Sequence, residues 1–199
     1  MTEEGLFVTI EGIDGAGKTT VVEAIQGNWK ASVRTQEPSE LWTGKQVRRA
    51  ISNDTDVHPL TTFYLFMADR VHHIEEEIKP ALDNGMLVVS DRYADSTLAY
   101  QPVALNDHIR FPQQYMEQTM EPWNFEPDLT LYIDIPVDVA IERTVGDEEY
   151  ENVEFLEQVK ENYDDLAKRF SHRFVRIDGN QSKERVREDC LTAIENHYE

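Results

Sequence analysis

The sequence predicts an α/β fold, a three-layer sandwich in which helices flank a central five-stranded parallel sheet. Five short runs rich in β-branched and aromatic residues are spaced along the chain, and helical patterns separate them. Strands that alternate with helices favour a parallel sheet, because a parallel neighbour is reached only through a crossover connection. A glycine-rich turn follows the first run directly, and we interpret that run as the central strand.

The predicted elements follow in a regular order. The predicted strands cover residues 6–10, 32–36, 86–90, 129–135 and 174–177. The predicted helices cover residues 19–27, 45–51, 60–82, 137–143, 153–170 and 183–198. The most regular of them is 60–82, where apolar residues recur at intervals of three and four until Asn84-Gly85 provides a stop signal.

Composition bounds the domain organisation and the compartment. The 199 residues, 40% of them hydrophobic, suffice for one sizeable core, so we expect a single domain over 1–199. No apolar run is long enough to span a membrane, and the acidic amino terminus differs from a secretory leader. Cys190 is the only cysteine, which excludes an internal disulfide and fits a reducing cytoplasm.

The charge of the chain narrows its partners. A formal net charge of −20 arises from 39 acidic and 19 basic residues, so repulsion disfavours binding to nucleic acid or to anionic lipid. The acids are spread along the chain instead of forming a tail. Such a surface stays hydrated where salt screens the repulsion, and we hypothesise a high-salt cytoplasm, as in a halophilic archaeon.

A phosphate-binding loop is the strongest motif. Residues 12–19 fit GxxxxGK(S/T) and join the first predicted strand to the first predicted helix. Backbone N–H groups of such a loop surround an anion, Lys18 reaches the β- and γ-phosphates of a triphosphate, and Thr19 offers a hydroxyl to Mg²⁺. The predicted nucleotide-binding residues are Gly12, Ile13, Asp14, Gly15, Ala16, Gly17, Lys18, Thr19 and Thr20. The alternative is a glycine-rich connection without chemical function.

The carboxylate expected beside this loop is Asp91. It ends an apolar strand, a position from which an acid holds Mg²⁺ or its waters. Arg92 follows directly and adds a cation for a phosphoryl group. Asp134, which ends the next apolar run, is a rival, and for either residue the alternative is a carboxylate that caps a strand-to-helix turn.

These motifs and several others resemble, in order, those of the thymidylate kinase family. The similarity runs from Phe7 to Ile177, whereas the Asn-Lys-x-Asp motif expected of a GTPase does not occur. In the family, the acid at the position of Asp14 approaches the 3′-hydroxyl of the acceptor nucleotide. An arginine at the position of Arg48 contacts the acceptor phosphate.

Two further segments resemble the family's acceptor site. Glu37 and Pro38 match an Arg-Glu-Pro motif in which Gln36 replaces the arginine. Phe66 and Arg70 match a helix that stacks thymine on its phenylalanine and hydrogen-bonds a thymine carbonyl with its arginine. Because they are four apart, the two side chains share a helix face. The alternative is that Phe66 packs in the core and Arg70 lies on the surface.

Residues 91–93 match the family's Asp-Arg-(Tyr/His) motif, and the helix after it places a tyrosine against the deoxyribose. The resemblance implies that Tyr100, beside Gln101, excludes a 2′-hydroxyl. Its alternative is a half-buried tyrosine on an amphipathic helix. Pro102 replaces a small residue of the family, and we expect it to alter the entrance to the acceptor pocket.

Arg143 matches the start of the family's lid, near the donor adenine or phosphates, so we expect a short lid around 143–152. Family members with glycine at the position of Gly15 bring lid arginines to the transferring phosphate, but residues 144–150 include no basic residue. Arg143 is therefore the remaining candidate to stabilise the transition state. Its replacement by alanine is expected to lower kcat far more than it raises the KM for ATP.

The resemblance implies a P-loop NTPase fold and a thymidylate kinase that transfers the γ-phosphate of ATP to dTMP, giving dTDP and ADP in dTTP synthesis. It assigns catalysis to Lys18, Asp91, Arg92 and Arg143, and Mg²⁺ binding to Thr19 and Asp91. It assigns dTMP binding to Asp14, Glu37, Pro38, Arg48, Phe66, Arg70, Arg92, Tyr100 and Gln101. It also implies a homodimer packed through helices.

Two other functions stay open from the sequence. One is a kinase for another nucleoside monophosphate or for a nucleoside, because the phosphate loop carries no information about the acceptor. The other is a nucleotide-binding sensor with little turnover, which the acidic lid favours.

Overall fold

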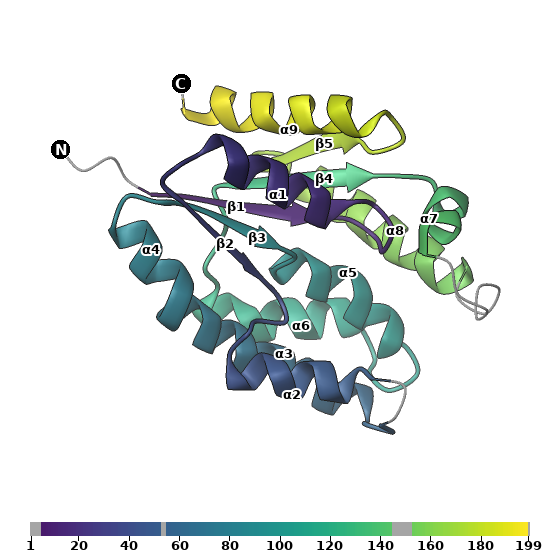
Figure 1. Cartoon of the computed structure of the whole chain (residues 1–199). Helices are drawn as coiled ribbons and strands as arrows, with labels where there is room; N and C mark the ends of the chain where they lie inside the picture. Colours follow the sequence, from purple (N-terminus) through teal and green to yellow (C-terminus); the bar gives the residue numbers. More distant parts are fainter. Residues whose placement is uncertain (1–4, 53–54, 145–152, 199) are drawn as a thin grey trace.

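The computed structural model describes residues 5–52, 55–144 and 153–198, and these contain a parallel five-stranded sheet between two layers of helices (Figure 1). The strand order is β2-β3-β1-β4-β5, so the predicted central position of the first strand is confirmed. The strands are β1 (Leu6–Glu11), β2 (Ser32–Gln36), β3 (Leu87–Asp91), β4 (Leu129–Asp134) and β5 (Phe174–Asp178).

The helices connect these strands in the predicted alternation. They are α1 (Lys18–Asn28), α2 (Trp42–Ala50), α3 (Pro59–His73), α4 (Lys79–Asp83), α5 (Ala94–Ala104), α6 (Pro112–Met120), α7 (Val137–Thr144), α8 (Val153–Arg169) and α9 (Lys183–Tyr198). A π-helical turn, η1 (Ile74–Ile78), joins α3 to α4, and a 3-10 turn, η2 (Glu121–Trp123), follows α6.

The two faces of the sheet are buried against different helices, because successive side chains of β1 point to opposite faces of the sheet. Leu6, Val8 and Ile10 pack with the apolar side of α1, and α9 continues this layer. Phe7, on the opposite face, packs with Ile74 of η1, and α5 and α8 lie on this side (Figure 1). Burial on both faces explains why the central strands are apolar along nearly their whole length.

Two elements differ from the sequence prediction. The helix predicted over 60–82 is interrupted by η1, just before Pro80, a residue that has no N–H and whose ring disturbs the preceding helical turn. Helix α6 was not predicted, because only Met116 and Met120 of its nine residues are buried and its sequence is otherwise mainly polar.

The parallel sheet brings the carboxyl ends of all five strands to one edge, the side at which α7 lies in Figure 1. The loops that follow the strands at this edge therefore lie close together, which is the usual position of a ligand site in an open α/β sheet. Among the described residues, no helix is long and apolar enough to cross a membrane.

Candidate active site

The phosphate loop occupies the central position at this edge, between β1 and α1. Gly17 adopts a left-handed conformation with φ of 92°, and helix α1 begins at the next residue. The N–H groups of Gly15, Gly17, Lys18 and Thr19 have no hydrogen-bond partner among the described residues. Free N–H groups at a helix N-terminus favour an anion, so this geometry fits the phosphates of a nucleotide.

Gly15 is the loop position at which some members of the resembling family carry an arginine. Its φ is +80°, and a Cβ atom here would lie 2.5 Å from the carbonyl oxygen of Ala140 in α7. A side chain at this position would therefore collide with the backbone of α7. The structure thus explains why the loop itself supplies no arginine.

Lys18 lies under the loop, with only 7% of its surface exposed. Its Nζ donates a hydrogen bond to the Ile13 carbonyl at 2.9 Å. Burial, together with the Arg92 cation, lowers the pKa of Lys18 to about 7, although Asp14 and Asp91 act in the opposite direction. Phosphate oxygens placed in the loop would stabilise the charged form of this lysine.

Thr19 and Asp91 meet as the sequence predicts. The Thr19 hydroxyl donates to Oδ2 of Asp91 at 2.8 Å, so two oxygen ligands suited to Mg²⁺ lie beside the phosphate loop. The rival Asp134 is engaged elsewhere: its carboxylate pairs with Lys160 and with Arg176. The structure therefore favours Asp91 as the candidate metal ligand.

Arg92 crosses from the end of β3 to the phosphate loop. Its backbone is left-handed, with φ of 68°, which turns the side chain toward the loop. Nη1 donates to the Gly12 carbonyl at 3.1 Å and to Ser96 Oγ at 3.0 Å, and Nη2 pairs with Asp14. Burial lowers the pKa of Arg92, but Tyr100, Asp14 and other acidic groups raise it well above its usual value. The guanidinium group of Arg92 is thus permanently charged and held in one orientation.

Tyr100 completes this cluster from α5. Its hydroxyl accepts a hydrogen bond from the Asp14 N–H at 3.1 Å, and its ring lies 5.1 Å from the Arg92 guanidinium carbon. Burial raises the pKa of Tyr100 to about 12. Asp14, Arg92 and Tyr100 therefore form one charged and aromatic group, which we call the acceptor cluster.

The pair formed by Arg70 and Glu37 lies behind this cluster. Arg70 is 1% exposed, so the surface alternative for this residue is wrong. Its Nη2 donates to Glu37 at 2.6 Å and to Thr97 Oγ1 at 2.7 Å, and His73 contacts the other Glu37 oxygen. Burial raises the pKa of Glu37, but Arg70 and His73 reverse this and lower it below its usual value. Both partners are charged and fix the segment that follows β2.

Two adjoining cavities meet at the acceptor cluster. The first, of about 290 Å³, is lined by Phe66, Tyr100 and Gln101, and we call it the Phe66 cavity. The second, of about 340 Å³, is lined by the phosphate loop, Arg48 and Asp91, and we call it the phosphate cavity. The residues that line both are Asp14, Glu37, Pro38 and Arg92.

Two residues depart from the family pattern: Gln36 lies at the phosphate cavity, and Pro102 does not belong to the described lining of either cavity. Gln36 lines the phosphate cavity and donates to Glu40 at 2.8 Å. Arg48 lines the same cavity and donates to the Pro38 carbonyl at 2.7 Å. Pro102 is buried inside α5 and does not belong to the described lining of the Phe66 cavity, so its effect on the entrance stays a prediction.

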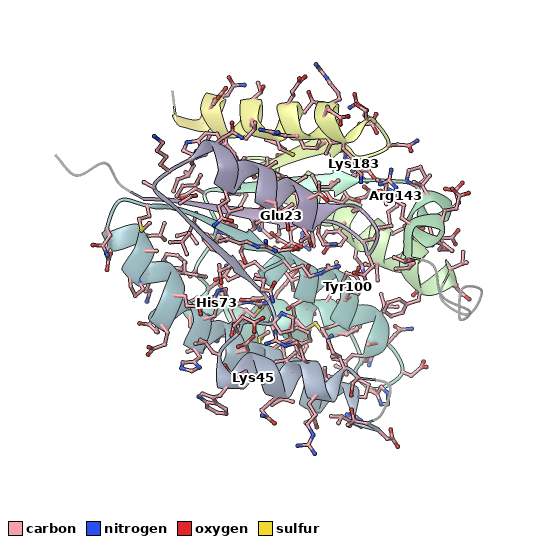
Figure 2. The ribbon with its side chains drawn as sticks, viewed as in Figure 1. Glu23, Lys45, His73, Tyr100, Arg143 and Lys183 are labelled. Carbon is pink, nitrogen blue, oxygen red and sulfur yellow. The ribbon has the colours of Figure 1, made fainter. Side chains whose placement is uncertain are left out.

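Arg143 lies on the other side of the phosphate loop from the acceptor cluster. It lines a cavity of about 450 Å³, the Arg143 cavity, together with Gly179 and Lys183. Figure 2 shows Arg143 and Lys183 near each other, apart from Tyr100 of the acceptor cluster. Its guanidinium donates to the Gly179 carbonyl at 3.3 Å and to that of Gly15 at 3.5 Å. Residues 145–152 of the expected lid lie outside the described residues.

Several residues of the site were not assigned from the sequence. Three residues, Tyr93, Ser96 and Thr97, line the Phe66 cavity. Of these, Tyr93 could have been identified from the sequence, because it is the last residue of the Asp-Arg-Tyr motif. Gln181 and Lys183 line the Arg143 cavity. These two residues follow the last strand, and the carboxyl ends of parallel strands form the edge of the sheet at which ligands bind. Their position in the sequence could therefore have identified them.

Comparison with known proteins connects this geometry to a family. The sequence profile described as thymidylate kinase matches residues 10–190. A probable thymidylate kinase from Natronomonas pharaonis is 40% identical over 192 residues, covering 96% of this chain and 97% of the relative. Another from Methanoculleus marisnigri is 43% identical over 187 residues, covering 91% of this chain and 90% of the relative.

A solved structure has the same architecture. The crystal structure of thymidylate kinase from Ehrlichia chaffeensis matches with a TM-score of 0.76 at 26% identity, over 96% of this chain and 98% of that chain. The predicted fold class is thereby confirmed. Relatives from the halophilic archaea Natronomonas pharaonis and Halobacterium salinarum agree with the acidic composition.

Proposed function

Because the chain belongs to the thymidylate kinase family of nucleoside monophosphate kinases, we propose that it transfers the γ-phosphate of ATP to the 5′-phosphate of dTMP, giving dTDP and ADP. The observation that carries this proposal is the position of Arg92, which lines both the Phe66 cavity and the phosphate cavity. A nucleotide whose base fills the first cavity presents its phosphate to Arg92, opposite the phosphate loop.

The Phe66 cavity suits a thymine base. Phe66 offers an aromatic face for stacking. Oε1 of Gln101 is buried without a hydrogen-bond partner among the described residues, so it favours a ligand that donates there. N3 of thymine carries such a hydrogen, whereas N3 of cytosine does not. Arg70, the other residue expected at the base, does not belong to the described lining of the Phe66 cavity, and its Nη1 donates to the weak acceptor Sδ of Met120 at 3.3 Å. A thymine carbonyl that displaces this weak contact would be a better acceptor for Arg70.

The reaction itself needs oriented charge more than covalent chemistry. An ionised acceptor phosphate requires no general base, so catalysis rests on alignment and on offsetting negative charge. Lys18 acts on the donor phosphates, and Arg92 and Arg48 hold the acceptor phosphate. Mg²⁺ fits the oxygen pair of Thr19 and Asp91, and when bound it would offset charge on the donor phosphates.

Tyr100 is the residue we expect to select the sugar. Replacing it by alanine should reduce the preference for dTMP over ribothymidine 5′-monophosphate by about tenfold, because room opens beside the 2′ position. The measurement is the ratio of kcat/KM for the two acceptors. Tyr100→Phe keeps the ring and is the matched control. An unchanged ratio in Tyr100→Ala would assign the selection to another residue.

The structure changes the expected effect of replacing Arg143. Because Arg143 lies in a cavity that excludes the acceptor cluster, we now expect Arg143→Ala to raise the KM for ATP by about tenfold with a smaller loss of kcat. Steady-state kinetics with ATP varied at saturating dTMP measure this. A large fall in kcat at unchanged KM would restore the transition-state role inferred from the sequence.

One assay tests the acceptor and the rival functions together. ADP release is followed with ATP·Mg²⁺ and, in turn, dTMP, dUMP, UMP, CMP, AMP and thymidine. We expect the largest kcat/KM with dTMP. A larger value with another acceptor would identify a kinase of different specificity, and activity with none would indicate a nucleotide sensor.

The assembly and compartment follow as parts of the same proposal. Trp42 of α2 and Tyr64 and Val71 of α3 are large apolar side chains that are 68%, 48% and 44% exposed on neighbouring helices. This surface supports a homodimer packed through helices. The single cysteine and the soluble substrate support a cytoplasmic location.

We also propose that residues 143–152 act as a short lid over the donor nucleotide.

A further inference from the structure

A buried carboxylate without an assigned role lies directly before the phosphate loop. Glu11 is the last residue of β1, and its side chain is fully buried. Oε1 accepts a hydrogen bond from the Tyr93 N–H at 2.8 Å. Oε2 accepts from Ser96 Oγ at 2.6 Å and from Tyr163 Oη at 2.9 Å. One carboxylate thus joins the central strand to the start of α5 and to α8.

The hydrogen bonds of Glu11 extend to Arg92 through one hydroxyl. An ionised carboxylate only accepts hydrogen bonds, so the Ser96 hydroxyl gives its single proton to Glu11. Its lone pairs are then free to accept from Nη1 of Arg92, at 3.0 Å. A protonated or amide side chain at position 11 would donate to Ser96 instead. The Ser96 proton would then turn either toward Arg92, where two donors repel each other, or toward the Tyr163 hydroxyl, which lies 2.8 Å from Ser96 Oγ. In both cases Glu11 would no longer direct the Ser96 lone pairs at Arg92.

We propose that Glu11 is a positioning residue for the acceptor phosphate, because through Ser96 it fixes the direction of the Arg92 guanidinium. This inference rests on the proposed role of Arg92 as the clamp on that phosphate. Glu11 itself does not belong to the described lining of the Phe66 or the phosphate cavity, so its effect reaches the substrate only through these neighbours.

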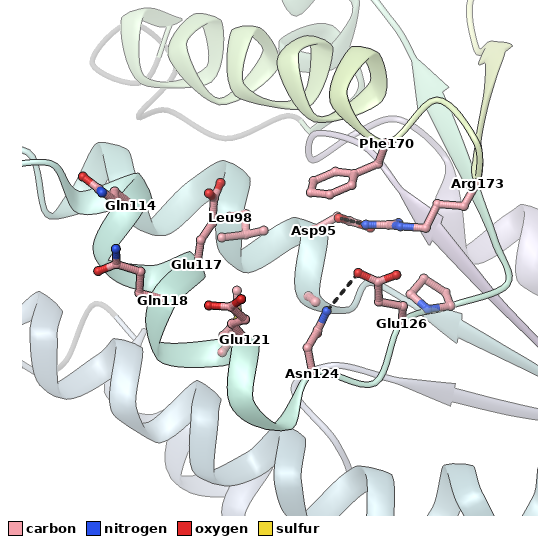
Figure 3. A pocket seen from close by; sticks show the side chains of 13 residues that line it. Asp95, Leu98, Gln114, Glu117, Gln118, Glu121, Asn124, Glu126, Phe170 and Arg173 are labelled. Carbon is pink, nitrogen blue, oxygen red and sulfur yellow. Dashed lines mark hydrogen bonds and ion pairs between the residues drawn. The ribbon is translucent and has the colours of Figure 1, made fainter.

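The charges around Glu11 set the pH range in which this device works. Burial and then the Asp95 carboxylate on α5 raise the pKa of Glu11 to about 7, against the effects of Ser96, Arg92 and Tyr163. Asp95 itself accepts two hydrogen bonds from Arg173, at 2.7 and 2.8 Å (Figure 3).

Three further cations complete this electrostatic environment. Lys18 of α1, Arg70 of α3 and Arg173 before β5 all experience the charge of Glu11. Because burial and Asp95 nevertheless outweigh their attraction, Glu11 gains a proton as the pH falls through about 7. The hydrogen-bond chain to Arg92 then reverses, and we expect phosphate binding to weaken.

The test compares the binding of dTMP and of thymidine to the full chain by calorimetry. Glu11→Gln should weaken dTMP binding about tenfold, the size of one lost charge-assisted hydrogen bond, and change thymidine binding less than about twofold. Thymidine lacks the phosphate that Arg92 holds. Tyr163→Phe should act in the same direction by about threefold. Tyr132→Phe is the matched control, because its ring stacks on Tyr163 at 5.3 Å while its hydroxyl contacts Asp164.

The outcomes separate this inference from the proposed function. The positioning role would be overturned if Glu11→Gln weakened the binding of dTMP and of thymidine equally. It would also be overturned if neither Glu11→Gln nor Tyr163→Phe weakened the binding of dTMP. Arg92→Met tests the clamp separately: if it binds dTMP as well as the unmodified chain does, the proposed function of Arg92 fails instead. Circular dichroism checks the fold of each variant.

A pH series on the unmodified chain needs no variant. Its preference for dTMP over thymidine should fall between about pH 8 and pH 6.5, above the range near pH 6 in which the acceptor phosphate itself titrates. Glu11→Gln should lose this dependence and keep only that of the phosphate. A preference that stays constant over this range in the unmodified chain would contradict the inference.

Discussion

Replacing Arg92 by methionine is expected to lower kcat/KM for dTMP by about 10³-fold or more. Among the described residues, Arg92 is the cation that lines both the Phe66 cavity and the phosphate cavity. Methionine keeps much of the side chain's length but removes its charge. The acceptor phosphate would then face the carboxylate of Asp14 without the cation that pairs with it. Burial raises the pKa of Asp14, but Arg92 and Lys18 lower it below its usual value, so removing Arg92 would leave Lys18 alone to offset this charge.

The control for this prediction is Arg92→Lys, measured by the same steady-state kinetics. Lysine restores the charge but not the planar fork that reaches Gly12, Ser96 and Asp14 together, so an intermediate loss of about tenfold to a hundredfold is expected. The KM for ATP should change less than the KM for dTMP, because Arg92 lines the Phe66 cavity as well as the phosphate cavity but does not line the Arg143 cavity. Activity of Arg92→Met within tenfold of the unmodified chain would remove Arg92 from the mechanism.

Replacing Lys18 by methionine is the second change with a large expected effect. The loss of this preorganised cation should reduce kcat by a factor on the order of 10²–10³. Lys18 is held under the loop by the Ile13 carbonyl, whereas the other cations of the phosphate cavity, Arg48 and Arg92, are held by Pro38 and by Gly12 with Asp14. Single-turnover measurements with saturating ATP and dTMP separate this loss of chemistry from weaker binding.

The same variant should be more stable than the unmodified chain in the absence of nucleotide. Burial lowers the pKa of Lys18 to about 7 in the folded chain, while its usual value is 10.5. Between these values the folded chain binds fewer protons than the unfolded chain, so its free energy of unfolding rises with pH. The stability advantage of Lys18→Met should therefore be largest below pH 7 and shrink toward pH 9 in urea unfolding. A pH-independent difference would show that Lys18 keeps its usual pKa.

The layered fold follows from the sequence because its signals are local. Each strand is a short apolar run, and the position of β1 at the centre follows from the phosphate loop that leaves it. The π turn between α3 and α4 does not follow, because the apolar spacing continues through it. Helix α6 was missed for the opposite reason, since its two buried methionines are too few to give a period.

The site was predictable where its residues lie in one motif or directly at the ends of predicted strands. The phosphate loop and the Thr19–Asp91 contact belong to this group, since both lie at strand ends that a parallel sheet brings together. The Arg70–Glu37 pair joins residues 33 positions apart, and the sequence placed Arg70 either on the base or on the surface. The Glu11 hydrogen bonds join residues 85 and 152 positions apart, and no sequence pattern marks them.

The placement of Arg143 shows how a position in space revises a role inferred by elimination. The sequence assigned it to the transferring phosphate because no other basic residue occurs nearby in the lid. In the structure its guanidinium donates to the carbonyls of Gly179 and Gly15, and Arg143 does not line the two cavities that contain the acceptor cluster. The cations that do line the phosphate cavity are Lys18, Arg48 and Arg92, each from a different segment of the chain.

Transfer of label from ATP to dTMP tests the central claim most directly. The protein is incubated with Mg²⁺, unlabelled dTMP and ATP labelled only at its γ-phosphate, and the products are separated and identified. The proposed function predicts labelled dTDP with the label in its β-phosphate, formed in equal amount to unlabelled ADP. Label recovered only as inorganic phosphate, or remaining in ATP while dTMP is unchanged, would contradict it.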